Sequence, residues 1–185
     1  MVFDSDTRLT EPPAAARRLR QAARQLAKFP HGGFFKKADS VLRGPVLAEI
    51  LGCMQGLERP RAVLIAGNPS LGRVIRNGQF TIDGQPLDRT PFATDPHHPA
   101  QSADVLALLR PAKNTSVAYL QPIGPLPQSG VIIGEHRNAA DTGRWVRLLD
   151  DDTLPAGAAD FFEAWLAAHS ERRRTSTEPG YSVVR

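Results

Sequence analysis

The segment from Lys37 to Pro45 carries the residue types best suited to chemistry on a small anionic ligand. Lys37 and Arg43 supply positive charge, and an arginine can hold a carboxylate or phosphate through two parallel hydrogen bonds. Asp39 could accept the proton of an attacking hydroxyl group, and Ser40 offers a hydroxyl that could bind a polyol. The structural alternative is that Asp39 or Ser40 caps the following helix while Arg43 forms a surface ion pair.

Two further segments contain chemically capable residues. Gly67 to Arg73 follows an apolar run, but its spacing differs from that of a phosphate-binding P-loop, so a tight turn with an exposed arginine is the simpler interpretation. Asp95, His97 and His98 have ligand chemistry suited to a metal. Adjacent residues of an extended loop point in different directions, however, and no further His or Cys lies at ligand spacing. We therefore predict no metal site.

The remaining nucleophiles and histidines lack the partners that catalysis needs. Cys53 lies among apolar residues at helical spacing and is predicted to be core. Ser40 lacks the G-x-S-x-G context of a hydrolase nucleophile. His31, His136 and His169 have no recognisable partners for a catalytic triad.

Composition limits the class of protein. The chain has 185 residues, enough for one domain with a sizeable core. A single cysteine excludes an internal disulfide framework, and no stretch has the roughly 20 apolar residues of a membrane span. The net charge of +4 comes largely from arginines in two groups, which are predicted to form a solvated helix face and a frayed tail, because no aromatic residues interleave with them as in a single-strand binding site. These groups are Arg17, Arg18, Arg20 and Arg24, and Arg172, Arg173 and Arg174. We expect a cytoplasmic protein that binds neither nucleic acid nor membrane.

Hydrophobic periodicity places these residues between alternating strands and helices. Strands are predicted to end at Val2–Asp4 and to cover Gly33–Ala38, Arg61–Gly67, Thr115–Leu120 and Val131–Glu135, with a hairpin over Gln79–Leu87. Helices are predicted over Pro12–Lys28, from Pro45 to Gly56, and over Ser102–Arg110, Asp141–Leu149 and Ala158–Arg174, the first one capped by Thr10. The alternation predicts a three-layer α/β fold: a mainly parallel sheet flanked by helices, with a β-hairpin insertion. Ligands bind such sheets where strands hand over to helices, which is where Lys37–Pro45 falls.

Four linked motifs make the chain resemble the N-terminal sugar-binding domain of the four-carbon acid sugar kinase family. The family's K-x-D-S-T-x-R-G-N stretch is matched by Lys37, Asp39, Ser40, Arg43 and Gly44, and its P-A-x-P-x-x-G-R element by Ala66, Pro69, Gly72 and Arg73. Its hairpin motif is matched by Gly78, Ile82, Gly84, Pro86 and Leu87, and its D-P-x-x-P segment by Asp95, Pro96 and Pro99, preceded by Thr90. Upstream, Asp4–Arg8 is similar to the family's D-T-D-S-R strand end. The agreement extends over about Val2 to Leu109.

The resemblance implies an ATP-dependent phosphorylation of a small sugar acid such as a threonate, an erythronate or a ketotetronate. It implies that Arg8, Lys37 and Arg43 neutralise the substrate carboxylate or the phosphoryl group, that Asp39 is the catalytic acceptor of a proton, and that Ser40 holds a hydroxyl. Gly44 belongs to the same substrate-binding loop, and Arg73 stands at the edge of the pocket. ATP and Mg²⁺ are implied for the family, but we expect this chain alone to bind neither.

Two residues and two segments depart from the family pattern, and they change the function that we expect. Val41 replaces a threonine, and Pro45 replaces an asparagine. The family's opening strand and its C-terminal nucleotide-binding domain have no counterpart, so we expect a truncated, incomplete sugar-acid-binding domain over residues 1–174 and a disordered tail over 175–185. The parallel sheet is then expected to expose an unpaired edge or slot, which a homodimer contact could cover.

Three functions stay open at this point. The chain could be a kinase part that is inactive alone and works with a separately encoded nucleotide-binding domain. It could be a non-catalytic module that binds a sugar acid, or a degenerate member of the family that keeps only the fold.

Overall fold

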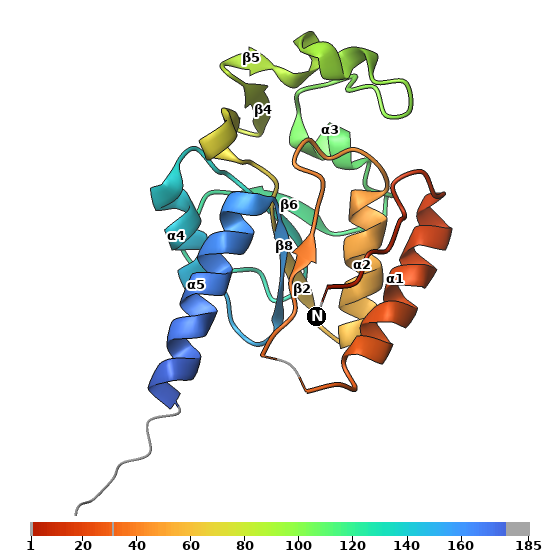
Figure 1. The fold of residues 1–185 in the computed structure, drawn as a ribbon. Helices are drawn as coiled ribbons and strands as arrows, with labels where there is room; N and C mark the ends of the chain where they lie inside the picture. The colour runs from red at the N-terminus through yellow and green to blue at the C-terminus, as the bar shows by residue number, and fades with distance from the viewer. Residues whose placement is uncertain (1, 31, 177–185) are drawn as a thin grey trace, which may run out of the picture.

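A five-stranded parallel sheet forms the centre of the computed structural model, which describes residues 2–30 and 32–176 (Figure 1). The strand order is β1 (Lys36–Lys37), β8 (Thr153–Gly157), β2 (Arg61–Ile65), β7 (Gly130–Gly134) and β6 (Val117–Leu120). Strands β2 and β8 are buried because they lie inside the sheet and are covered on both faces.

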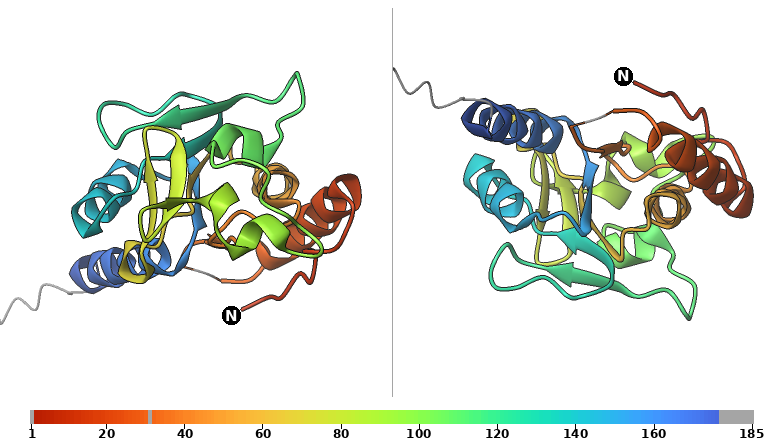
Figure 2. Two further views of the ribbon diagram at one scale, coloured as in Figure 1. Left: turned by 90° about the horizontal axis from the view of Figure 1, so that it is seen from above. Right: turned by 90° about the horizontal axis from the view of Figure 1, so that it is seen from below.

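Helices cover both faces of this sheet, as the predicted three-layer α/β fold requires (Figure 2). Helices α1 (Pro12–Leu26), α2 (Val46–Leu57) and α3 (Val105–Leu109) lie on one face, and α4 (Ala139–Leu148) and α5 (Ala159–Ser176) on the other. Successive side chains of β2 point into the two cores in turn. Leu64 packs in the cluster that contains Ile50 of α2, whereas Val63 packs with Trp145 of α4. None of the described helices is long and apolar enough to span a bilayer.

A small antiparallel sheet stands above the carboxyl ends of the parallel strands (Figure 1). It consists of β3 (Arg73–Arg76), β4 (Gln79–Ile82) and β5 (Gln85–Pro86), and it contains the predicted hairpin insertion. Three 3₁₀ turns flank it: η1 (Pro69–Leu71), η2 (Leu87–Arg89) and η3 (Pro91–Thr94). Backbone hydrogen bonds between Ile75 and His136, which lies just after β7, connect the insertion to the main sheet.

Helices α1 and α2 pack closely because α2 presents glycines to α1. A Cβ on Gly52 would lie 2.3 Å from the carbonyl oxygen of Ala16, and one on Gly56 would lie 2.6 Å from that of Arg20. Gly56 was predicted to end the helix, but α2 ends at Leu57, and the residue that caps it, Glu58, takes the left-handed conformation. The first arginine group lies exposed along α1, as predicted for a solvated face.

Several predicted elements differ from the observed ones. Residues 2–4 form no strand, and Val2 is exposed. The strand predicted over 33–38 narrows to Lys36–Lys37, and α1 is preceded by Glu11 without a side-chain cap, so Thr10 does not cap it. Strands β3 and β8 were not predicted at all. Helix α5 extends to Ser176, so the expected tail over 175–185 lies mostly outside the described residues.

The parallel sheet has two open edges, β6 at one end and the shorter β1 at the other. Its two residues pair with β8 on one side, and no other strand among residues 2–30 and 32–176 pairs with it. The preceding residue Phe35 contacts Phe161, Phe162 and Trp165 of α5, so aromatic packing rather than strand pairing fixes the approach to β1.

Candidate functional site

The loop that follows β1 is organised by the carboxylate of Asp39. Its Oδ1 accepts hydrogen bonds from the backbone N–H groups of Val41 (3.0 Å) and Arg43 (3.3 Å), which closes the loop on itself. Leu42 and Gly44 take positive φ angles of 61° and 83°. Helix α2 begins after Pro45 without a side-chain cap, so neither Asp39 nor Ser40 caps it, and that part of the structural alternative is wrong.

Arg43 joins two carboxylates from distant parts of the chain. Its guanidinium donates to Asp39 Oδ2 through Nη2 (3.0 Å) and to Asp95 Oδ2 through Nη1 (3.2 Å). The ring of Phe92 lies 5.3 Å from its Cζ, within the range of a cation–π contact. The side chain is 27% exposed, so Arg43 is held at the site and is not a freely solvated surface residue.

Arg8 reaches the same carboxylate from the N-terminal segment. Its Nη2 lies 3.5 Å from Asp39 Oδ2, and its carbonyl oxygen is bonded to Nε2 of His98 at 2.8 Å. Gly44 allows this approach, because a Cβ there would lie 2.9 Å from the Arg8 carbonyl oxygen. Three separate segments thus meet around Asp39.

A buried network below the site fixes the N-terminal segment. Glu49 of α2 accepts a hydrogen bond from the hydroxyl of Thr7 at 2.5 Å and forms an ion pair with Lys36 of β1 at 2.8 Å. Thr7 and Glu49 are buried. Because Thr7 precedes Arg8, this network determines where the Arg8 backbone passes.

Lys37, Ser40 and Arg73 complete the predicted set. Arg73 Nη1 donates to the hydroxyl of Ser40, which links the loop after β1 to that after β2. Lys37 Nζ donates to the carbonyl of Ala38 at 2.7 Å. Burial lowers the pKa of Lys37; Asp39 opposes this shift, whereas the positive charges of Arg73 and Arg8 add to it. The structure therefore brings all seven predicted site residues to one end of the sheet.

The acidic residues of the site stay ionised. Burial would raise the pKa of Asp39, but hydrogen bonds from Arg43 and Val41 outweigh it and lower that pKa. The backbone N–H groups of His98 and His97, together with Arg43, lower the pKa of Asp95 to about 2. Four cationic side chains, from Arg8, Lys37, Arg43 and Arg73, thus accompany two carboxylates, which leaves an excess of positive charge suited to an anionic ligand.

A cavity of about 660 Å³ adjoins this cluster between the start of α2 and the loop at His97–Gln101. Its lining includes Arg43, Gly44 and Pro45 together with His98 and Leu109. Arg43 is therefore the one cation of the predicted set, as far as the described residues show, that faces both the Asp39 cluster and the cavity.

Asp95 belongs to the site although sequence reasoning assigned it no role in ligand binding. Its Oδ1 accepts from the N–H groups of His97 (3.1 Å) and His98 (2.8 Å), so this aspartate organises a turn. Within the described ranges, no three His, Cys, Asp or Glu side chains are grouped as metal ligands would be. The D-P-x-x-P motif was the available signal for this position.

Two other polar groups at the carboxyl edge were also missed. Asp160, at the start of α5, accepts from both the N–H and the hydroxyl of Ser70, which ties η1 to this helix. Glu135, after β7, is 1% exposed and accepts from the Tyr119 hydroxyl and the Asn77 N–H. No spacing in the sequence indicated these long-range pairs.

The cysteine and the histidines for which the sequence showed no catalytic partner have structural contacts where the structure describes them. Cys53 is buried, as expected, and its burial raises the pKa of the thiol to about 11. His136 is buried and bonded to the carbonyl of Gly67 and the hydroxyl of Thr142. His169 stacks on Trp165. His31 and the side chains of Arg172–Arg174 lie outside the described residues.

Comparison with known proteins identifies the class to which this fold and site belong. The family model of the sugar-binding N-terminal domain matches residues 1–129, so the chain belongs to that family. It is 29% identical over 162 residues to the D-erythronate kinase of Heliobacterium modesticaldum, covering 83% of this chain and 37% of that enzyme. It is 39% identical over 77 residues to the D-threonate kinase of Salmonella typhimurium, covering 40% of this chain and 18% of that enzyme. The chain thus spans well under half the length of these relatives.

Solved structures share the fold. A protein of a family of unknown function from Bordetella bronchiseptica, crystallised with citrate as a domain-swapped dimer, superposes with a TM-score of 0.72 at 24% identity, over 89% of this chain and 44% of that one. A Haemophilus influenzae protein of the same kind gives a TM-score of 0.75 at 15% identity, over 95% of this chain and 46% of that one. The resemblance to the four-carbon acid sugar kinases and the α/β fold are both confirmed.

Proposed function

We propose that this chain is the sugar-acid-binding part of an ATP-dependent kinase for four-carbon sugar acids of the erythronate, threonate or ketotetronate type. The observation that carries the proposal is the convergence of Arg8, Lys37, Arg43 and Arg73 around Asp39 and Ser40 at the carboxyl edge of the sheet. The excess positive charge fits a carboxylate, and the hydroxyl and carboxylate groups fit a polyol. The relationship to two sugar-acid kinases supports the same substrate class.

Each residue of this set would have a separate role in binding or proton transfer. Arg43 would grip the substrate carboxylate from the cavity side, with Arg8 and Lys37 adding charge, and Arg73 would hold Ser40 against a substrate hydroxyl. Asp39 would accept the proton of the attacking hydroxyl group as its oxygen bonds to the transferred phosphorus. Its lowered pKa makes it a weak base, so its main contribution would be to position the hydroxyl, because phosphoryl transfer depends mainly on positioning and charge stabilisation.

The nucleotide is proposed to bind elsewhere than on the described residues. Those residues provide no group of ligands that could hold a metal ion, and no glycine-rich phosphate loop occurs in the sequence. We propose that the chain is inactive alone, in the cytoplasm, until a nucleotide-binding domain joins it.

Calorimetric titration with D-erythronate and D-threonate tests the binding site. We expect Arg43→Ala to weaken binding by at least about tenfold, the scale of a charge-assisted hydrogen bond, and Arg43→Lys to weaken it less because it keeps the charge. Arg17→Ala, on the exposed face of α1, is the matched control and should bind like the wild type. Equal affinity of the wild type and Arg43→Ala would remove Arg43 from the site.

An assay of ADP formation separates the kinase part from a binding module. The chain alone should form no ADP with either acid, and adding the nucleotide-binding domain of a related kinase should start turnover. Turnover by the chain alone would contradict its proposed inactivity. Binding of the acids without turnover in any combination would favour a non-catalytic sugar-acid-binding module, and a lack of binding would favour a degenerate family member.

A homodimer is proposed as the cover for an open edge of the parallel sheet, since β1 and β6 are each paired on one side only among the described residues. The domain-swapped dimer of the Bordetella protein supports exchange of elements in this fold. Light scattering during size-exclusion chromatography should give twice the chain mass. A mass of one chain at all concentrations would refute the dimer.

A further inference from the structure

Glu49 of α2 connects two of the segments that carry the cations of the candidate site. Its side chain is only 10% exposed. Oε1 accepts a hydrogen bond from Thr7 at 2.5 Å, and Oε2 pairs with Lys36 Nζ at 2.8 Å. Each of these partners directly precedes a site cation, because Thr7 is followed by Arg8 and Lys36 by Lys37. One buried carboxylate therefore holds the neighbours of two site residues.

The contact with Thr7 fixes the N-terminal segment where it enters the site. Thr7 is 2% exposed, and its hydroxyl also lies 2.9 Å from that of Ser5. Figure 1 shows this segment running alongside α2 on its way to α1. Beyond Thr7, Arg8 Nη2 reaches Asp39 Oδ2 at 3.5 Å, and the next residue, Leu9, lines the cavity of about 660 Å³. A displacement of Thr7 would thus move both a cation and a wall of the cavity.

The contact with Lys36 fixes the end of β1. Lys36 Nζ, which pairs with Glu49, also donates to the carbonyl of Lys37 at 2.7 Å. The buried carboxylate is therefore linked to the peptide that leads into the site loop. Among the described residues, the two residues of β1 pair with β8 alone, so the side-chain contact adds to a short hydrogen-bond ladder.

We propose that Glu49 is a positioning residue of the sugar-acid site and does not touch the ligand. It acts on Arg8 through Thr7. It acts on Lys37 through Lys36. The inference rests on the proposed function. Hydrogen bonds to a buried charged group are stronger than neutral ones, whereas an ion pair in solvent contributes little. The Arg8 side chain is 59% exposed, so its own ion pair is too weak to keep it at the site without this anchor.

Calorimetric titration measures the contact with Thr7, using D-erythronate or D-threonate, whichever binds the wild type more tightly. Thr7→Val removes the hydroxyl but keeps the shape, and we expect it to weaken binding about three- to tenfold. Thr7→Ser keeps the hydroxyl and should restore most of the affinity. Thr81→Val, in β4, makes the same change where the hydroxyl forms no hydrogen bond with the described residues, and should bind like the wild type.

A variant of Arg8 separates positioning from a general loss of structure. If Thr7 acts through Arg8, Thr7→Val should change the affinity by less than about twofold in a chain that already carries Arg8→Ala. Equal weakening by Thr7→Val with and without Arg8→Ala would show that Thr7 supports only the fold. That result would overturn the inference.

The contact with Lys36 is tested in the same way. Glu49→Gln keeps an acceptor for Thr7 but loses the charge that pairs with Lys36, so we expect weaker binding in the wild-type background. The effect should fall below about twofold when Lys37→Met is already present. Equal weakening in both backgrounds would contradict this part of the inference. Circular dichroism checks folding, and if Glu49→Gln alone does not fold, it is combined with Lys36→Met, which removes the unpaired charge.

Trypsin cleavage after Arg8 tests the anchor without any ligand. Cleavage requires the Arg8 side chain and backbone to leave the site, so we expect Thr7→Val to be cut there at least about fivefold faster than the wild type. Thr81→Val should be cut at the wild-type rate, and mass spectrometry identifies the product. Unchanged cleavage of Thr7→Val would overturn the inference even if the acids bind. If the wild type binds neither acid, the proposed function fails, whereas faster cleavage of Thr7→Val would still support the anchoring of Arg8.

Discussion

At the scale of single residues, the site depends on side chains whose partners lie far away in sequence. Arg43 is held by Asp39 four residues before it and by Asp95 fifty-two residues after it. Each carboxylate also accepts backbone N–H groups of its own loop. The pairs therefore link the conformations of the two loops, and a ligand carboxylate that takes Arg43 must compete with both aspartates.

Gly44 tests how much the site depends on the close approach of the N-terminal segment. Gly44→Ala places a Cβ 2.9 Å from the Arg8 carbonyl oxygen at a φ of 83°. We expect about 2–3 kcal/mol of destabilisation, the left-handed conformation and the displaced backbone each contributing about 1 kcal/mol or more. Chemical denaturation measures it.

Gly84→Ala is the matched control for Gly44→Ala. Gly84 has a φ of 81°, but a Cβ there would meet nothing within 4 Å. The difference between the two variants isolates the contact with Arg8. Equal destabilisation by both would show that this contact is unimportant.

The burial of His136 predicts that the free energy of unfolding depends on pH in the acid range. Burial lowers its pKa below the ordinary value of 6.5, whereas the hydrogen bond to Gly67 and the charges of Asp160 and Asp141 oppose the shift. Between pH 6.5 and the lowered pKa, the unfolded chain binds a proton that the folded chain does not. The free energy of unfolding should therefore fall as the pH drops below 6.5, by up to about 1.4 kcal/mol per pH unit for this residue.

Urea denaturation at a series of pH values measures this effect. His136→Gln should reduce the slope below pH 6.5, whatever it does to the stability itself, because it removes the titrating group. Gln25→Ala, at an exposed position without a titrating side chain, is the control and should leave the slope unchanged. An unaltered slope in His136→Gln would assign the pH dependence to other groups.

At the scale of elements, the helix pair α1–α2 depends on the missing side chain of Gly52. Gly52→Ala would place a Cβ 2.3 Å from the Ala16 carbonyl oxygen, so the helices would have to separate. We expect about 1–3 kcal/mol of destabilisation, measured by denaturation, although alanine favours helix more than glycine does.

Gly143→Ala in α4 is the corresponding control. A Cβ there would meet only the end of the Arg147 side chain, at 3.5 Å. Helix propensity alone then predicts a stabilisation of about 0.5–1 kcal/mol. Opposite signs for the two variants would confirm the packing argument, and a stabilised Gly52→Ala would contradict it.

Some turns and strands have a short sequence signal from which they can be predicted, and others do not. The Asp83-Gly84 turn was found from its dipeptide, and both residues have positive φ angles, as do Asn77 and Gly78 in the unpredicted turn between β3 and β4. That hairpin could have been found from the same signal. Strand β8 could not, because Pro155 stands in the middle of a five-residue run, and proline argues against an interior strand.

The site residues were identifiable for a different reason. Asp39, Ser40 and Arg43 follow a strand and precede a helix, and that position alone points to the carboxyl edge of an α/β sheet. Their partner Asp95 lies on an irregular loop that no periodicity places, and Glu49, which supports Arg8, occupies a helix position where a solvated face is the usual expectation. Tertiary pairing decides these roles.

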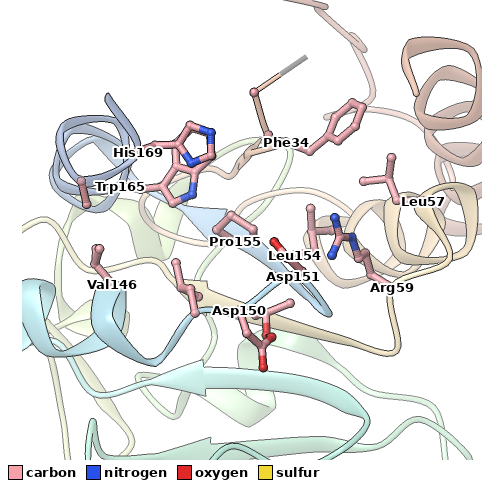
Figure 3. A pocket seen from close by; sticks show the side chains of 15 residues that line it. Phe34, Leu57, Arg59, Val146, Asp150, Asp151, Leu154, Pro155, Trp165 and His169 are labelled. Carbon is pink, nitrogen blue, oxygen red and sulfur yellow. The ribbon is translucent and has the colours of Figure 1, made fainter. Parts of the chain in front are cut away.

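At the scale of the whole molecule, the parallel sheet separates two chemically different ends. The carboxyl edge gathers charged loops from the N-terminal segment, β1, β2 and the region around Asp95. The amino edge holds a smaller pocket of about 230 Å³, whose lining mixes Arg59 and Asp151 with Leu154 and Trp165 (Figure 3).

The chain has two tryptophans, one near the carboxyl edge of the parallel sheet and one near its amino edge, so each edge has its own fluorescent side chain. Trp145 is fully buried and donates a hydrogen bond from Nε1 to the carbonyl of Glu135, beyond the carboxyl end of β7. Trp165 is half-buried and lines the 230 Å³ pocket at the amino ends of the strands. A dry indole emits at shorter wavelengths than one near water. Replacing either tryptophan by phenylalanine would leave a single natural reporter, so that the unfolding of the two ends could be followed as separate emission signals without an attached dye.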